Sequence, residues 1–125
     1  MFFIDEDKTI HITRGDVAIV EITAISEAGD YIFAVGDVVR ISVFDKKGCD
    51  NVVLRKDTNV EEETTAVEIY LDSEDTKFGE VISKTKDYWY EIELNPGTAP
   101  QTIIGYDEDG AKVFKLYPEG GDESE

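Results

Sequence analysis

The chain has 125 residues, and its 29 Asp and Glu against 12 Lys and Arg give a formal net charge of −17 at pH 7. Such a charge repels nucleic-acid phosphates and anionic lipid headgroups, so neither nucleic acid nor a membrane is expected as a partner. With 41% hydrophobic residues, we expect one globular domain that needs neither a disulfide nor a metal for stability.

The N-terminal residues and the single cysteine indicate where the chain is made. Residues 1–4 are followed at once by Asp5-Glu6-Asp7, whereas a secretory signal has a basic start and a longer apolar run. No run approaches the ~18 consecutive apolar residues that span a membrane. Cys49 is the only cysteine, which excludes an internal disulfide and fits a reducing compartment. We therefore expect synthesis in the cytoplasm.

Short runs of alternating apolar and polar residues recur in the first half of the chain, and this period of two is typical of half-buried strands. The pairs Gly15-Asp16 and Gly36-Asp37 precede two of these runs. Glycine there supplies a positive φ, and Asp bonds nearby amides, so both pairs predict turns. The runs predict strands at Thr9–Thr13, Asp16–Ile25, Val38–Phe44 and Asn51–Lys56, with a brief aromatic segment at Tyr31–Phe33.

The second half continues the same pattern around one less regular segment. Asp72–Gly79 has an acidic start and no alternation, so we expect a helical turn or loop that crosses between two sheets, with Phe78 as a plug. After it, Val81–Ser83 is expected to begin a strand. Further strands are predicted at Thr65–Leu71, Asp87–Leu94, Thr102–Tyr106 and Ala111–Tyr117, and in the second of these Tyr88, Tyr90, Ile92 and Leu94 face the core while Trp89 faces away.

The domain boundaries follow from where the alternation stops. Residues 1–117 are predicted to form a single β-sandwich domain, because many short strands separated by turn residues are the signature of a sandwich or barrel. Residues 118–125 are rich in Gly, Asp and Glu and contain nothing to bury, so they are predicted to be a disordered acidic tail.

The residues that commonly carry catalysis are few and unconnected. His11 is the only histidine, and no pattern links it to Cys49 as a base to a nucleophile. With so many carboxylates, the spacing of any one pair is uninformative. We therefore expect no enzymatic activity, no catalytic residues and no cofactor.

Two kinds of short motif are typical of binding sites, but turn chemistry explains the same residues. The acidic runs 72–75 and 107–110 supply oxygen ligands of the kind that calcium takes, but neither has the spacing of a twelve-residue calcium loop. We predict solvated turns and assign no metal site, with calcium as the open alternative. Arg14-Gly15-Asp16 spells a cell-adhesion tripeptide, but Gly-Asp opens another strand without the arginine, so we predict a turn here too.

Three features follow one another along the chain in an order more specific than each feature alone. An Ile-x-Ile-x-Arg-Gly-Asp turn and its strand occupy residues 10–22, and Phe-x-x-Gly-Asp at 33–37 opens an apolar strand. A Leu-x-x-Glu-Asp-Thr crossing at 71–76 then leads to a Tyr-x-Tyr-x-Ile-x-Leu strand at 88–94 and to Thr-Ile-Ile-Gly at 102–105. This order resembles the immunoglobulin-like β-sandwich of phage and prophage structural proteins of Gram-positive bacteria, and is similar to the N-terminal domains of baseplate upper proteins.

The resemblance implies an all-β fold, an immunoglobulin-like antiparallel β-sandwich of about 7–9 strands. It also implies a non-catalytic tail or baseplate component that assembles through sheet faces and edges with other virion proteins, or with copies of itself, and that is part of the virion when assembled. Aromatic side chains commonly anchor such interfaces. The candidate interface residues are Trp89, Tyr31, Tyr106, Phe2 and Phe3.

A carbohydrate-binding β-sandwich module at a cell or virion surface is the alternative. Such a module keeps aromatic side chains on an exposed sheet face, where they stack on sugars. Trp89 with Tyr31 or Tyr106 would provide that platform, and the same residues serve either function.

Overall fold

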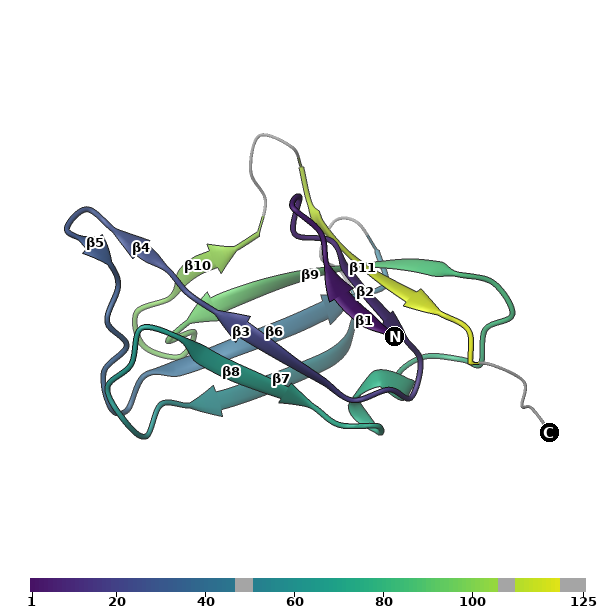
Figure 1. The fold of residues 1–125 in the computed structure, drawn as a ribbon, viewed down its shortest axis with the longest axis horizontal. Helices are drawn as coiled ribbons and strands as arrows, with labels where there is room; N and C mark the ends of the chain where they lie inside the picture. Colours follow the sequence, from purple (N-terminus) through teal and green to yellow (C-terminus); the bar gives the residue numbers. More distant parts are fainter. Residues whose placement is uncertain (47–50, 106–109, 120–125) are drawn as a thin grey trace.

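A computed structural model describes residues 1–46, 51–105 and 110–119, and in them the fold is all-β with one short 3₁₀ turn, η1 (Asp75–Lys77) (Figure 1). None of the described helical segments is long and apolar enough to cross a membrane. The strands are β1 (Phe2–Ile4), β2 (Ile10–Thr13), β3 (Ala18–Ile22), β4 (Ile25–Ser26), β5 (Gly29–Asp30), β6 (Val38–Phe44), β7 (Val52–Asn59), β8 (Val67–Leu71), β9 (Lys86–Leu94), β10 (Gln101–Ile104) and β11 (Lys112–Tyr117).

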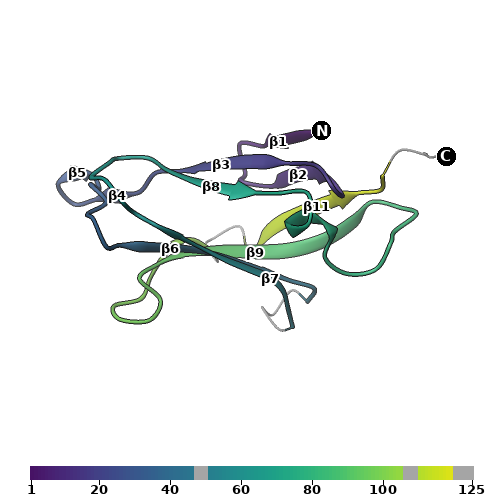
Figure 2. The same ribbon diagram turned by 90° about the horizontal axis from the view of Figure 1, so that it is seen from below.

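Two layers of strands enclose the core, as Figure 2 shows, which confirms the predicted all-β sandwich. The large sheet has the order β1-β2-β11-β9-β6-β7, with β10 also paired to β9, and the small sheet contains β3 and β8. The pairing of β2 with β11 is parallel, and the other pairs are antiparallel. Parallel neighbours need a long connection, which almost the whole domain provides here.

Each alternating run predicted as a strand corresponds to a strand in the structure; Val38–Phe44 is matched at both ends, and the other runs have shifted ends. Three additional strands, β1, β4 and β5, have only two or three residues each, too few for alternation to be recognised. The predicted strand start at Val81–Ser83 is wrong: these residues form no strand, and Val81 is 84% exposed. A short segment with no neighbouring strand gains too few contacts to offset the backbone entropy that is lost when a strand becomes ordered.

The core lies between the two sheets and is built from alternate residues of both layers. Tyr88 and Tyr90 of β9 face it as predicted. Phe78 packs against Tyr88 and against Phe114 of β11, and Phe114 also packs against Tyr90. Phe78 is 8% exposed and follows η1, so the predicted plug is confirmed. The other fully enclosed large side chains include Ile10, Ile12, Ile22, Phe33, Ile41, Ile69, Leu71, Ile92 and Leu116.

The predicted acidic tail is described only at its start. Pro118 is half-buried, and the carboxylate of Glu119 accepts a hydrogen bond from Arg14 at 3.0 Å. Residues 120–125 lie outside the described residues, as do Cys49 and Tyr106. The prediction of disorder for the tail therefore stays a prediction.

The turn at Gly36-Asp37 depends on the carboxylate of Asp37. This carboxylate accepts hydrogen bonds from the Ala34 amide at 2.9 Å, the Asn95 side-chain amide at 3.1 Å and the Tyr31 hydroxyl at 3.1 Å. The bond from the Ala34 amide is the largest influence lowering the pKa of Asp37, with burial opposing it and Asn95 and Tyr31 adding to it. The charged form is thus favoured in the folded state.

Acid is therefore expected to weaken the fold through Asp37. Because its folded pKa lies below its unfolded value, about 3.9, its contribution is complete above that value and is lost as the pH falls through the folded pKa. Asp37→Asn should be less stable than wild type at pH 7 and should lose less stability between about pH 4 and 2. Thermal unfolding at several pH values measures both, with Asp30→Asn, at an exposed position of β5, as the control. Equal acid sensitivity of Asp37→Asn and wild type would contradict this prediction.

Candidate interaction surfaces

The outer face of the large sheet carries a row of apolar side chains that includes Trp89. In the register of the sheet, Trp89 on β9 lies between Phe44 on β6 and Val113 on β11, so all three project from the same face. Phe44 is 3% exposed, and Trp89 and Val113 are half-buried. The prediction that Trp89 faces away from the core is confirmed. Trp89, Phe44 and Val113 form a second, smaller apolar row on the outer face of the sheet.

Charged and polar side chains flank this row toward β7. Arg40 of β6 forms a two-bond ion pair with Asp57 of β7 at 2.6 and 3.0 Å, which lowers the pKa of Asp57 against its partial burial. Arg55 donates to the hydroxyl of Ser42 at 3.2 Å. Burial and the neighbouring Glu93 raise the pKa of Glu91, while Arg55 opposes them. The outer face of the large sheet is thus polar and largely paired around one aromatic row.

The other predicted interface residues do not gather around Trp89. Phe3 projects from the same face, on β1, and is 47% exposed. Phe2 points to the opposite side and packs against the core. Tyr31 is half-buried at one end of the sandwich, where its ring packs edge-on against Phe33 at 5.0 Å and its hydroxyl binds Asp37.

Sequence reasoning missed a polar cluster around His11. The two ring nitrogens of His11 lie 2.8 Å from the Tyr117 hydroxyl and 2.6 Å from the Asp5 carboxylate, and Phe3 stacks on the ring at a centroid distance of 4.2 Å. These residues join β1, β2 and β11. Because these contacts bridge three strands, the cluster fastens the N-terminal strand to the sheet.

The Arg-Gly-Asp sequence forms a turn whose arginine is engaged within the domain. The Arg14 side chain is 10% exposed, and its guanidinium donates to Glu119 and to the carbonyl oxygen of Lys77 at 2.9 Å. The Gly15 amide donates to the Thr76 hydroxyl, which in turn donates to the Asp16 carbonyl at 2.8 Å. The tripeptide thus locks the start of β3 to the crossing around η1.

The acidic run 72–75 also forms a turn, which is held by hydrogen bonds within the run. The Asp72 carboxylate accepts from the Asp75 amide at 2.9 Å, and the Asp75 carboxylate accepts from the Asp72 amide and pairs with Lys56. Lys56 thus neutralises the Asp75 carboxylate, which a metal cation would otherwise bind. No group of three or more candidate metal-ligating side chains occurs in the part of the chain that the structure describes, and most of the run 107–110 lies outside that part.

The outer face of the small sheet exposes an apolar cluster that alternation alone did not single out. Val17, Ile19 and Tyr70 are 51%, 52% and 50% exposed, and Ile19 on β3 lies directly opposite Tyr70 on β8. Two register pairs further on, and on the same face, Glu21 lies opposite Glu68, and both are exposed. We call these five residues the β3–β8 patch.

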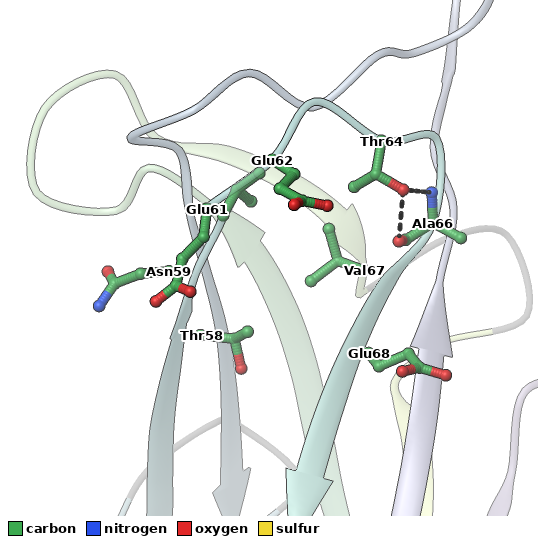
Figure 3. Close-up of a pocket in the computed structure, with 9 residues that line it drawn as sticks. Thr58, Asn59, Glu61, Glu62, Thr64, Ala66, Val67 and Glu68 are labelled. Carbon is green, nitrogen blue, oxygen red and sulfur yellow. Dashed lines mark hydrogen bonds between the residues drawn. The ribbon is translucent and has the colours of Figure 1, made fainter.

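A groove of about 540 Å³ opens beside this patch, between the end of β7 and the start of β8 (Figure 3). Its walls include Glu61, Glu62 and Glu68, and the side chains of these three have no ion pair or hydrogen bond within the described ranges 1–46, 51–105 and 110–119. On its rim, the Thr64 hydroxyl binds both polar backbone groups of Ala66. The groove is therefore anionic, and Glu68 is shared with the β3–β8 patch.

A second cavity, of about 670 Å³, lies between the β4–β5 hairpin and β10. Ile25 on the hairpin is 86% exposed, and Ile103 and Ile104 of β10 are half-exposed on the far wall. Of the predicted interface residues that the structure describes, only Tyr31 lines it. The charged residues among its described lining are Lys8 and Glu27, and they give no indication of a ligand class.

Comparison with protein-family models, with curated proteins and with solved structures finds no match. By its fold, the chain is an all-β sandwich in which a two-stranded sheet covers a larger one.

Proposed function

We propose that this chain is a non-catalytic structural module of a phage or prophage virion, in the tail or baseplate, that acts through protein–protein assembly. The observation that carries the proposal is the exposed apolar part of the β3–β8 patch. Single exposed apolar residues are common on soluble proteins, but Ile19 and Tyr70 are directly opposed across two strands, with Val17 beside them. Contiguous apolar surface rimmed by polar groups is typical of interaction sites.

The topology supports the same proposal. In the described residues β3 pairs only with β8, so each strand of the small sheet has an edge without a ladder partner. Open edges and half-covered faces are the features by which sandwich domains join neighbouring subunits. The order of sequence motifs that resembles phage structural proteins supplies the assignment to a virion.

A carbohydrate-binding module is the second candidate, and Trp89 favours it. The half-buried indole lies on a sheet face next to the polar pair Ser42 and Glu91, and sugar sites combine aromatic faces with polar groups. An affinity gel with immobilised polysaccharide distinguishes the two functions, because retention without any protein partner supports only the second.

The test of the virion proposal is to purify particles from an induced culture of the source strain and quantify this chain by mass spectrometry. We expect it at a stoichiometric ratio to other tail proteins. Its absence from intact particles would overturn the virion proposal.

Trp89→Ala is expected to lower incorporation into those particles while the isolated domain stays folded, because anchor aromatics dominate interface energies. Circular dichroism and quantitative mass spectrometry measure the two effects, with Val81→Ser, at an 84% exposed position remote from the sheets, as the control. Loss of the fold would show that Trp89 is a core residue of the outer layer instead.

A further inference from the structure

The β3–β8 patch combines apolar exposure with an unfavourable arrangement of charge. Glu21 and Glu68 face each other across the two strands, and within the described residues neither carboxylate has a cationic or hydrogen-bonding partner. Like charges directly opposite one another destabilise a sheet. The arrangement is therefore one that a cation from outside would relieve.

The aromatic member of the patch is held in place before any partner arrives. The ammonium group of Lys56 lies 5.6 Å from the centroid of the Tyr70 ring and is itself paired with Asp75. A cation over a ring restricts its orientation, and an ordered anchor loses less entropy on binding. Tyr70 is thus a pre-positioned apolar surface beside two unpaired carboxylates.

The acidic surroundings extend beyond the patch. Glu68 also lines the groove that contains Glu61 and Glu62 (Figure 3), so the anionic surface is continuous from the small sheet to the end of β7. A second copy of this chain would bring the same carboxylates to a two-fold interface, and each chain has a net charge of −17. Self-association through this face is therefore electrostatically disfavoured.

We propose that the β3–β8 patch is the docking surface for a different protein that presents apolar side chains on Ile19 and Tyr70 and lysine or arginine side chains on Glu21 and Glu68. This assignment rests on the proposed assembly function for its biological role. Its chemistry is that of a charged rim around an apolar centre, in which the charges select the partner and the apolar contacts hold it.

The first test uses the isolated domain and a defined probe, a short synthetic peptide of alternating lysine and valine, in an amide NMR titration. We expect the shift changes to concentrate on β3 and β8, and the matching glutamate–valine peptide to cause none. Ile19→Ser and the double variant Glu21→Lys/Glu68→Lys should each weaken binding about tenfold. Shift changes spread over the whole acidic surface would overturn the proposal.

Matched variants elsewhere keep this test specific. Ile25→Ser removes an isoleucine that is 86% exposed, and Glu27→Lys/Glu80→Lys reverses two exposed glutamates away from the patch. Both should bind the lysine–valine peptide as wild type does, whereas an equal loss would show that only total charge or total apolar area matters and would overturn the proposal. Circular dichroism checks that every variant is folded.

The second test measures incorporation of the same variants into purified particles. Lower incorporation of the patch variants than of the matched controls supports the docking surface. Wild-type incorporation of the patch variants overturns it and leaves the virion proposal standing. If the wild-type chain is absent from particles, the virion proposal fails, and the peptide titration still decides the chemistry of the surface.

Discussion

Phe114→Ala is expected to lower the free energy of unfolding by about 3–5 kcal/mol. Phe114 has no exposed surface, and its ring packs against Phe78 and Tyr90 at centroid distances of 5.6 and 6.4 Å. Truncation removes buried apolar area and leaves a cavity between the layers. Since domains of this size are stable by about 5–15 kcal/mol, the variant should retain only a fraction of its stability.

Urea unfolding followed by the fluorescence of Trp89, the only tryptophan, measures this loss. Val113→Ala is the matched control, because Val113 adjoins Phe114 in β11 but points to the outer face and is half-buried. It should cost less than about 1.5 kcal/mol. Phe114→Leu provides a milder variant if the alanine variant does not fold. Equal losses at positions 113 and 114 would contradict the assignment of the core.

Arg14→Ala is expected to cost about 1.5–3 kcal/mol of stability, because it removes the charge-assisted hydrogen bonds of a largely buried arginine side chain. The guanidinium links the turn before β3 to the carbonyl oxygens of Lys77 and Gly79 and to Glu119, at 2.9, 3.5 and 3.0 Å. The same contacts withhold the arginine from any receptor, so wild type should not compete with an Arg-Gly-Asp peptide for adhesion receptors.

Chemical unfolding and an adhesion competition assay measure the two expectations. The control is Arg55→Ala, an exposed arginine whose bond to Ser42 lies on the sheet surface, which should change the free energy of unfolding little. Stability of Arg14→Ala equal to that of wild type, or competition by the folded wild-type chain, would show that the turn is free to bind.

The strands were predictable because each long run leaves one face in the core. Alternation in β9 placed Tyr88 and Tyr90 inward and Trp89 outward, as observed, and Phe78 was expected beneath the crossing. Alternation could not reveal β1, β4 or β5, since runs of two or three residues contain no repeat. The prediction of a strand at Val81–Ser83 is wrong for the converse reason, because a short apolar pattern without a neighbouring strand to pair with does not form a strand.

The candidate surface was less predictable than the fold. Trp89, Phe2, Phe3 and Tyr31 were chosen as aromatic residues, but the structure distributes them over two faces and one end of the domain. The β3–β8 patch depends on the pairing of Ile19 with Tyr70, which are far apart in the sequence. A signal was present in the outward positions of both runs, where apolar residues replace the polar ones expected on a solvated face.

Local periodicity and turn chemistry are sufficient to predict the all-β class, the positions of the main strands and the division of β9 into inward and outward residues. Three further relations depend on the packing of the layers: β2 runs parallel to β11, His11 contacts Asp5 and Tyr117, and Glu21 faces Glu68. Those relations join strands far apart in the chain. They follow from which layers pack together, and local periodicity contains no information about that choice.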